Sequence, residues 1–419
     1  MLKPRYRTGD QALVREINLS IVFNRLWTHA PLSRAQLADV TGLNKTTVSS
    51  LIQDLLGKGF VREAGLRLSR GGRPATLIEL NPQAGCMLGL EIGVDFISAI
   101  LTNFRAEIEW RHHESTTPRS GYQTIIERAE SIIQHGIQVA ERRGMQVLGV
   151  GVGVPGLVDL DSGIVRFAPN LEWRDVPLRA MVLESLSMPI LVDNDANLSA
   201  LGEYYFGTAR GMDTFIYITI GTGLGGGLFL DGQPYRGIGG YAGEFGHMSL
   251  RDDGLRCNCG NQGCWETVVS ISAVVRSAQS AVETQPASRM LDLAHNQASR
   301  ITLPIVIQAA EQGDETALQV LHQTGYYLGI GITNLVNAFN PGLIVLGGGL
   351  SPAYPFMVPI AQRVVADRAM ATPAKSTRIV ASSYGEDACV FGAVGYVLHE
   401  ILTMPNYTLP AAVNSQPKR

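Results

Sequence analysis

The sequence lacks any long apolar run. The longest ones, such as Leu343 to Leu346, are far too short to cross a bilayer. The basic N-terminal residues are not followed by an apolar segment, so no secretory signal peptide is expected. Cysteine is scarce, with five in 419 residues, and no disulfide framework is indicated. These absences predict a cytoplasmic protein with reduced thiols and no membrane insertion.

The length and the charge distribution predict more than one domain. A chain of 419 residues is too long for one ordinary core, so two or three domains are expected. The net charge of −3 hides an asymmetry: residues 1–80 hold twelve Lys/Arg and six Asp/Glu, a net of +6. The remainder holds 34 − 12 = 22 basic and 37 − 6 = 31 acidic residues, a net of −9. A basic head on an acidic body suggests that the head meets a polyanion.

Three of the five cysteines fall within eight positions, in the stretch GEFGHMSLRDDGLRCNCGNQGCWE. His247, Cys257, Cys259 and Cys264 form a Cys3His set, which predicts a closed, structural Zn²⁺ site. The alternative is that these cysteines lie close together by chance. The metal would hold a loop that also carries acidic side chains, and such a rigid loop suits a polyhydroxylated ligand.

The first 60 residues have the pattern of a helix-turn-helix. Residues 11–29 form the first helix, with Leu13, Ile17, Ile21 and Leu26 predicted on its apolar face. Ser33 can cap a helix over residues 34–40, and Asn44 can cap another over residues 45–56. In a helix-turn-helix the second of these two helices enters the major groove of DNA. Its exposed candidates for DNA contact are Lys45, Thr46, Thr47, Ser49 and Ser50.

The head continues as two predicted strands, residues 60–63 and 76–80, which flank a basic segment. This segment resembles a β-wing with Arg67, Arg70 and Arg73 at its tip, and arginines on such an extended arm fit a narrow minor groove. The alternatives are a three-helix protein-binding module and a solvated basic loop. Residues 81–85 have linker composition.

The body alternates strands and helices. Strands are predicted over residues 147–154, 190–192, 215–220 and 343–346, with a strand pair over residues 86–101 that turns near Gly93. The strand at 190–192 leads into DNDANLSALGE, which places Asp195 at the carboxyl end of a strand, where α/β proteins keep ligand sites. A helix N-cap is the alternative role for Asp195. Residues 221–227 are expected to form a glycine-rich loop.

These motifs together resemble the ROK family of repressors, open reading frames and sugar kinases. The specific segments are GEFGHMSL with CNCGNQGCWE, DNDANLSALGE and GTGLGGGLFLDGQPYRG. The resemblance implies an α/β actin-like (ribonuclease H-like) body of two lobes behind an N-terminal winged helix-turn-helix. The expected divisions are residues 1–80 for the head, 81–85 for the linker, 86–205 with 390–404 for the first lobe, 206–389 for the second lobe with the zinc loop, and 405–419 for a flexible tail.

The resemblance also implies the sugar site. Asn194 and Asp195 would bind sugar hydroxyls, and Asp195 corresponds to the catalytic base of the family's kinases. The other sugar-binding residues would be Gly156, Asn170, Glu244, His247 and Glu266, with His247 also a zinc ligand. Carboxylates and amides are the side chains that bind several hydroxyls at once, which agrees with this assignment.

One motif of the kinases is missing. The kinases of the family begin their body with the motif Asp-x-Gly-Gly-Thr, which binds the phosphates of ATP. The equivalent segment here is Glu91 to Asp95. The Gly-Thr pair is absent, and the carboxylate of Asp95 takes its place. A carboxylate repels phosphate, so this loss should prevent phosphoryl transfer, and Asp195 would be a vestigial base.

Three hypotheses follow. The first is a transcriptional regulator, a repressor of carbohydrate genes that binds operator DNA as a homodimer or a dimer of dimers and responds to a monosaccharide effector. The second is an ATP-dependent sugar kinase with a regulatory head. The third is a protein-interaction scaffold. Glucose, xylose and N-acetylglucosamine would all fit the same set of residues.

Overall fold

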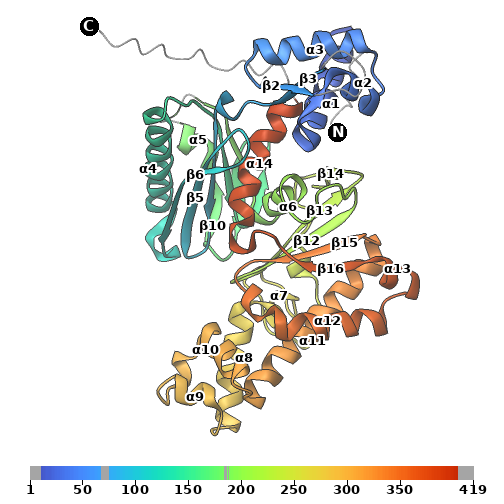
Figure 1. Ribbon diagram of the computed structural model, residues 1–419. Helices are drawn as coiled ribbons and strands as arrows, with labels where there is room; N and C mark the ends of the chain where they lie inside the picture. The colour runs from blue at the N-terminus through green and yellow to red at the C-terminus, as the bar shows by residue number, and fades with distance from the viewer. Residues whose placement is uncertain (1–10, 68–74, 184–185, 187, 404–419) are drawn as a thin grey trace.

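The computed structural model describes residues 11–67, 75–183, 186 and 188–403. A small head lies at one end, followed by two five-stranded sheets and a group of helices at the far end (Figure 1). No helix in these ranges is long and apolar enough to span a bilayer. The chain therefore has a small head on a body built around two sheets.

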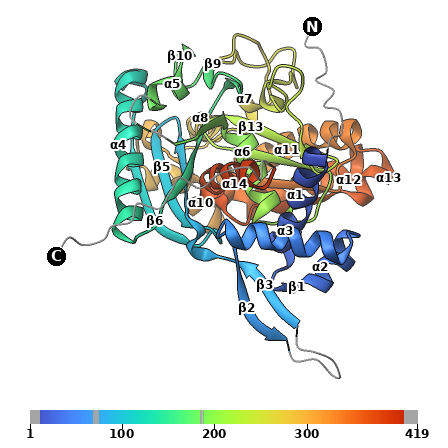
Figure 2. The same ribbon diagram turned by 90° about the horizontal axis from the view of Figure 1, so that it is seen from above.

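The head contains three helices and a β-hairpin: α1 (Gln11–His29), α2 (Arg34–Thr41), α3 (Lys45–Gly57), β2 (Val61–Arg67) and β3 (Ala75–Leu80), with the short β1 (Leu32–Ser33) paired to β3. The predicted caps are confirmed, because Ser33 accepts from the N–H of Gln36 and Asn44 accepts from the N–H of Thr47. Gly42 ends α2 at a left-handed φ of 71°. The hairpin extends away from the helices when the molecule is seen from above (Figure 2).

Two details of the predicted head differ from the structure. The buried face of α1 is formed by Leu19, Val22, Phe23 and Leu26, whereas Ile17 and Ile21 are exposed by 51% and 38%. The prediction of Leu26 is confirmed, whereas Ile17 and Ile21 lie on the neighbouring, exposed side of the helix. The hairpin strands are also longer than predicted. Leu13 has no described side chain, and the predicted wing residues Arg70 and Arg73 lie outside the described residues.

The first sheet has the strand order β11-β7-β4-β5-β6. Its strands are β4 (Cys86–Ile92), β5 (Phe96–Asn103), β6 (Ile108–Ser115), β7 (Val147–Val154) and β11 (Ile190–Asn194). The predicted turn at Gly93 is confirmed, and β7 lies between the parallel neighbours β4 and β11. A smaller sheet of β8 (Leu157–Asp159), β9 (Ile164–Ala168) and β10 (Trp173–Val176) and the short helix α5 (Leu178–Leu183) lie beside it.

Helices from distant parts of the chain cover the two faces of this sheet. They are α4 (Gly121–Arg142) on one side and the closing helix α14 (Ala388–Thr403) on the other (Figure 1). The α14 backbone lies so close that a Cβ at Gly89 would stand 2.2 Å from the carbonyl of Val390, and one at Gly151 would stand 2.2 Å from that of Ala393. Only glycine permits this approach, so α14 is an integral part of the first lobe.

The second sheet has the order β14-β13-β12-β15-β16, and its strands are β12 (Phe215–Ile220), β13 (Leu224–Leu230), β14 (Gln233–Pro234), β15 (Leu343–Gly347) and β16 (Arg378–Ala381). Its helices are α7 (Glu266–Val269), α8 (Ile271–Thr284), α9 (Arg289–Leu293), α10 (Leu303–Glu311), α11 (Glu315–Phe339), α12 (Tyr354–Arg368) and α13 (Ala371–Ser376). The prediction of a loop over residues 221–227 was wrong in its second half. Gly225, Gly226 and Gly227 pair with β12 inside β13, because a side chain there would collide with helix α6 (Asp195–Tyr205) or with Phe245.

The head and the first lobe share one core. Phe104, which follows β5, is fully buried between head residues, with ring centroids 6.0 Å from Phe23 and 5.5 Å from Phe60. Trp27 contacts Phe104 at 6.3 Å and Phe206 at 5.9 Å, both edge to face. The head is therefore packed against the body through aromatic contacts in addition to its covalent connection.

Candidate functional site

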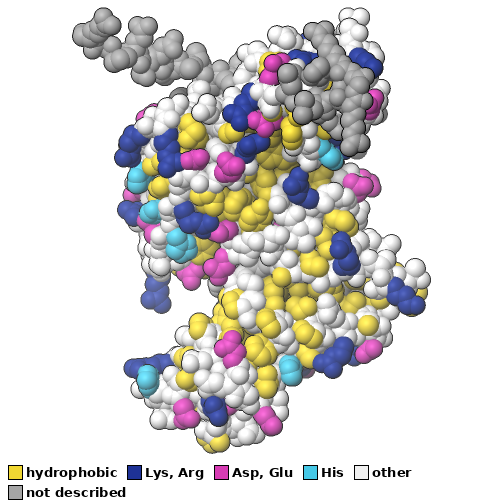
Figure 3. Space-filling model, viewed as in Figure 1, with side chains coloured by type: hydrophobic (Ala, Val, Ile, Leu, Met, Phe, Trp, Pro, Cys, Tyr) yellow, Lys and Arg dark blue, Asp and Glu magenta, His cyan; other side chains and the backbone are white. Residues whose placement is uncertain are grey.

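A cavity of about 910 Å³ lies between the two sheets. The molecule is visibly hollowed between the first lobe and the lower helices in the space-filling view (Figure 3). All seven residues that the sequence assigned to sugar binding line this cavity: Gly156, Asn170, Asn194, Asp195, Glu244, His247 and Glu266. They come from segments up to 110 residues apart, so the fold brings the whole predicted set together.

The start of α6 (Asp195–Tyr205) forms one wall of the cavity. Strand β11 ends at Asn194, whose Oδ1 accepts from the N–H groups of Ala196 and Asn197 at 2.9 and 3.2 Å. Asn194 is thus the N-cap, and the alternative that Asp195 is the cap is wrong. The Nδ2 of Asn194 donates to the carbonyl of Gly156 at 3.1 Å, which links the helix start to the turn after β7. Asp195 is left with its carboxylate on the cavity.

Burial raises the pKa values of two carboxyl groups of the cavity. Desolvation raises the pKa of Asp195 to about 6, against the opposing hydrogen bond from the N–H of Ala196. Desolvation, with the charges of Asp195 and Glu266 adding to it, raises the pKa of Glu244 to about 7. Groups of this kind alternate between accepting and donating hydrogen bonds near neutral pH, which suits the hydroxyls of a sugar.

The opposite wall is formed by Glu266 and Asn170. The Oε2 of Glu266 accepts from the N–H of Leu224 at 3.3 Å, and the Oδ1 of Asn170 accepts from Asn258 at 3.0 Å. Residues 221–223 pass directly beside both, because a Cβ at Gly223 would stand 2.9 Å from Glu266 Oε2 and 3.1 Å from Asn170 Nδ2. This part of the predicted glycine-rich loop is thus confirmed, and it closes the wall of the cavity.

The predicted metal ligands form a compact group beside this wall. One ligand atom from each of His247, Cys257, Cys259 and Cys264 lies within 4.8 Å of all the others. The Sγ atoms of Cys259 and Cys264 are 3.8 Å apart, and Cys257 Sγ is 3.6 Å from His247 Nδ1. A tetrahedral ion with Zn–S bonds of about 2.3 Å requires ligand separations of roughly 3.8 Å, so the group fits such an ion.

Two neighbours connect this group to the cavity. Cys257 Sγ donates to Glu266 Oε1 at 2.8 Å, and His247 presents its Nε2 to Glu244 at 3.7 Å. The Nδ1 of His247 faces the sulfur atoms, so one ring edge is available to a metal and the other to the cavity. An ion held here would fix the orientation of His247 and of the loop that carries it.

The segment that replaces the kinase phosphate motif lies among other acidic side chains in the folded protein. Glu91 is buried, with only 8% of its surface exposed, and its Oε2 has no hydrogen-bond partner among the described residues. Desolvation, and next the charge of Asp195, raise the pKa of Glu91 well above its usual value. Asp95, Glu386 and Asp387 line the same end of the cavity. Phosphate groups placed beside Asp95, Glu386 and Asp387 would meet carboxyl groups, whose negative charge repels phosphate.

One interaction at the site has no signature in the sequence. Arg236, just after β14 in the second lobe, donates from Nε and Nη2 to Oδ2 of Asp193 at 2.9 and 2.7 Å. Asp193 is 1% exposed and directly precedes Asn194. The two residues are 43 positions apart, so no spacing rule would have found them. The pocket residues Ser98, Arg111 and His113, from β5 and β6, were also missed.

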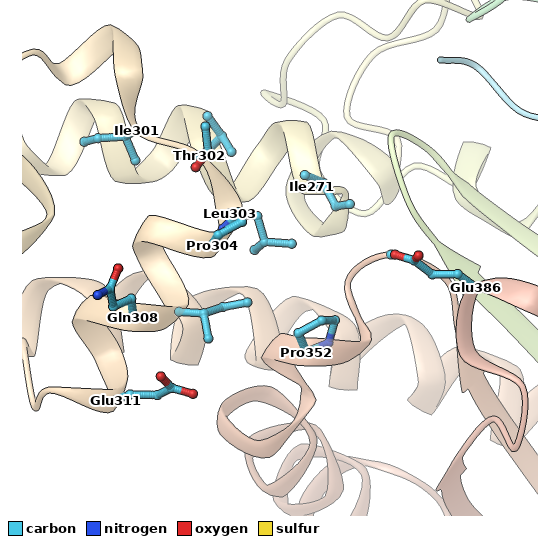
Figure 4. A pocket seen from close by; sticks show the side chains of 12 residues that line it. Ile271, Ile301, Thr302, Leu303, Pro304, Gln308, Glu311, Pro352 and Glu386 are labelled. Atoms are coloured by element: carbon cyan, nitrogen blue, oxygen red, sulfur yellow. The ribbon is translucent and has the colours of Figure 1, made fainter. Parts of the chain in front are cut away.

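A second, apolar pocket of about 680 Å³ adjoins the cavity and shares Ile271, Gly349 and Glu386 with it. Its walls come from α8, α10 and the turn after β15 (Figure 4). The side chains of Leu303 and Pro304 lie between the Ile301 end and Ile271, while Glu311 and Gln308 lie at the other edge. The larger cavity thus has a mixed lining that includes most of the carboxyl and amide groups, whereas its neighbour is lined mainly by apolar side chains.

The predicted DNA-contacting helix has its expected faces. Val48, Leu51, Ile52 and Leu55 are buried. Lys45, Thr46, Ser49 and Ser50 are exposed, and Thr47 is half-buried. The hydroxyl of Ser50 already accepts from Arg15, which also pairs with Asp54, so Ser50 is the least available of the set. Arg67 lies on β2, but the structure does not describe its side chain.

The fold and the cavity define the class: a two-lobed α/β protein with a cavity between its lobes and an added helix-turn-helix head. The profile of the ROK family matches residues 87–400. The chain belongs to the ROK family, and it falls in the repressor branch of that family.

Three relatives support this placement. The xylose repressor of Bacillus subtilis (strain 168) is 34% identical over 94% of this chain and 98% of its own length. The structure of a ROK family transcriptional regulator, a homologue of the E. coli MLC protein, is 25% identical with a TM-score of 0.79, over 94% of this chain and 99% of that one. A ROK family glucokinase from Streptomyces griseus, in complex with glucose and AMPPNP, has 32% identity and a TM-score of 0.68, and covers 75% of this chain and 100% of its own.

The coverage separates the two branches. The repressor and the regulator extend over 94% of the chain, whereas the whole glucokinase accounts for only 75%. The family profile begins at residue 87, just after the head. The head is thus the part that this chain has in addition to a sugar-kinase body.

Proposed function

We propose that this chain is a transcriptional repressor that reads a monosaccharide in its cleft and adjusts its affinity for operator DNA accordingly. One observation carries the proposal: a complete set of sugar-binding side chains lines a cavity whose phosphate end is acidic, on a body that is packed against a helix-turn-helix head. Such a molecule retains recognition of a sugar and lacks the means to phosphorylate it. A bound sugar then has an effect only if it changes the helix-turn-helix head and its affinity for DNA.

We propose D-xylose as the effector, because the relatives that match over nearly the full chain are named xylose repressors. Hydroxyls of the pentose would contact Asn194, Asp195, Glu244 and Glu266. The near-neutral pKa values of Asp195 and Glu244 let each carboxyl adapt to the hydroxyl that it meets.

We propose that the bound metal is Zn²⁺ in a structural site. The ligands are three thiols and one imidazole, the separations suit a tetrahedron, and no fifth protein position is required. When bound, the ion supplies fixed geometry and no reaction. His247 and the loop after it then hold their places in the wall of the cleft.

For DNA, we propose that α3 enters the major groove with Lys45, Thr46, Thr47, Ser49 and Ser50 near bases and phosphates, and that Arg67, Arg70 and Arg73 contact the minor groove beside it. A two-fold operator requires two heads, so the active species is a homodimer or a dimer of dimers. The net charge of +6 in residues 1–80 provides the attraction to DNA.

The kinase alternative has one feature in its favour. The apolar pocket beside the cleft offers space for a nucleobase, and the glucokinase relative is described with AMPPNP. The phosphates of such a nucleotide would have to pass Glu91, Asp95 and Asp387, with Arg111 already paired to Asp387 at 2.6 Å. Phosphoryl transfer needs neutralisation of the phosphate charges, which this surface does not provide.

The test begins with selection of high-affinity duplexes from a random pool, followed by titration of a labelled duplex with the full chain. We expect specific binding that weakens as salt rises and weakens further with D-xylose, while D-arabinose serves as the matched control sugar. Incubation with ATP and a panel of sugars should release no ADP above background. Binding that is no tighter to selected than to random duplexes, or steady ADP release, would overturn the proposal.

A further inference from the structure

The loop at Arg236 joins the second lobe to the sugar-binding turn of the first. Arg236 donates two hydrogen bonds to Asp193 Oδ2, at 2.9 and 2.7 Å. The arginine side chain is 19% exposed and the aspartate 1%, so the ion pair is shielded from water on most sides. Shielding makes such a pair strongly directional, and it makes the loss of one partner costly.

The second oxygen of Asp193 holds the turn itself. Its Oδ1 accepts from the N–H of Asn194 at 2.7 Å and from Nδ2 of Asn197 at 3.2 Å. Asp193 thus accepts two hydrogen bonds from the other lobe and two from the first turn of α6. Asn194 in turn caps α6 and donates to the carbonyl of Gly156. A chain of hydrogen bonds therefore links Arg236 through Asp193 to Asn194, which lines the cavity beside Asp195.

The same guanidinium also contacts the closing helix. It lies over the ring of Tyr396 in α14, 5.6 Å from the ring centroid. Arg236 is therefore fixed on two sides, by a carboxylate and by an aromatic face, which restricts its rotamers. A side chain held in this way can fix the position of Asp193 and, through it, the start of α6.

We propose that Arg236 is a positioning residue of the sugar site, acting through Asp193 to hold Asn194 and Asp195 in the geometry that binds sugar hydroxyls. This inference rests on the proposed function, since it concerns the same cleft. Arg236 does not line the cleft and does not touch the sugar. Its effect on affinity comes entirely from the shape that it imposes on the start of α6.

The experiment measures D-xylose binding to the full chain by calorimetry. Arg236→Met is expected to weaken D-xylose binding by about tenfold or more, because displacement of a site by about 1 Å has effects of that size. Arg236→Lys keeps the positive charge, so it should bind D-xylose more tightly than Arg236→Met and more weakly than wild type. Arg166→Met is the matched control: Arg166 also pairs with a carboxylate, Asp159 at 2.8 Å, but does not line the cleft, and binding should stay within about twofold.

A second variant guards against misfolding. Arg236→Met alone leaves the buried Asp193 charge without its partner, so the double variant Arg236→Met with Asp193→Asn removes the charge while leaving Oδ1 to accept from Asn194. The double variant should fold and should still bind D-xylose about tenfold more weakly than wild type. Wild-type affinity in the folded double variant would overturn the inference. If wild type itself binds no D-xylose, it is the proposed function that fails, and the two failures are therefore distinguishable.

Discussion

Phe104 offers the sharpest test of how the cleft and the head communicate. Its side chain is fully buried and contacts three aromatic rings of the head, those of Phe23, Trp27 and Phe60. Truncation of a buried phenylalanine to alanine costs about 3–5 kcal/mol. Because these three ring contacts all join the head to the body, most of the cost of Phe104→Ala falls on the docking of the head.

The size of that cost can be compared with the expected coupling. A ligand typically changes the affinity at a distant site by about 1–3 kcal/mol, which is about 5–150-fold. The sugar can change DNA affinity only if the head follows the conformation of the body, and Phe104 is part of the interface that makes it follow. With about 3–5 kcal/mol removed from this interface, the sugar should change DNA affinity by less than about threefold in Phe104→Ala.

The assay is a titration of a selected, labelled duplex with and without saturating D-xylose. Phe104→Ala should bind D-xylose like wild type, because Phe104 does not line the cleft, and should still bind DNA. Leu328→Ala is the control, since Leu328 is fully buried in α11 far from the head and its truncation also costs about 2–5 kcal/mol. A wild-type sugar response in Phe104→Ala, or its disappearance in Leu328→Ala, would refute the reasoning.

Three further predictions concern the site and the core. Because the pKa of Asp195 is raised to about 6, folding takes up a proton there between about pH 4 and 6, so this group lowers stability as the pH rises through that window. The affinity for the sugar, measured by calorimetry at a series of pH values, should change near pH 6, where Asp195 loses its proton. Asp195→Asn should remove this pH dependence. Metal chelation or Cys264→Ser should weaken D-xylose binding without changing DNA affinity in the absence of sugar, and a metal content of zero in active protein would count against the site. Glu203 is fully buried and accepts from Ser382, Ser383 and Thr208, so Glu203→Ala should lower the free energy of unfolding by about 3 kcal/mol or more in urea titrations, whereas a decrease below about 1 kcal/mol would contradict this.

Local sequence patterns were sufficient for much of the fold. The caps at Ser33 and Asn44, the turn at Gly93 and the helix start after Asp193 depend on interactions within a few residues, and their predictions were confirmed. The four candidate metal ligands do lie together as predicted, and three of them are within eight positions of one another in the chain. The sequence predicts a structural feature correctly where the residues whose contact determines that feature lie within a few positions of one another.

Predictions failed where a distant partner decides the outcome. Gly225, Gly226 and Gly227 indicated a loop, but they are needed in a strand because α6 and Phe245 come so close. The exposed Ile17 and Ile21 were assigned to the core of α1, since apolar spacing alone does not tell which of two neighbouring faces meets a partner. The seven residues that line the cavity were brought together mainly by the family resemblance, and the Arg236 to Asp193 pair was not predicted at all.

The place of α14 has a consequence for synthesis on the ribosome. The first sheet needs this helix to cover Gly89 and Gly151, yet its residues emerge about 300 positions after β4. During synthesis the first sheet therefore lacks the helix that covers this face until about 300 further residues have been translated, and its exposed apolar surface is open to non-native contacts for that time.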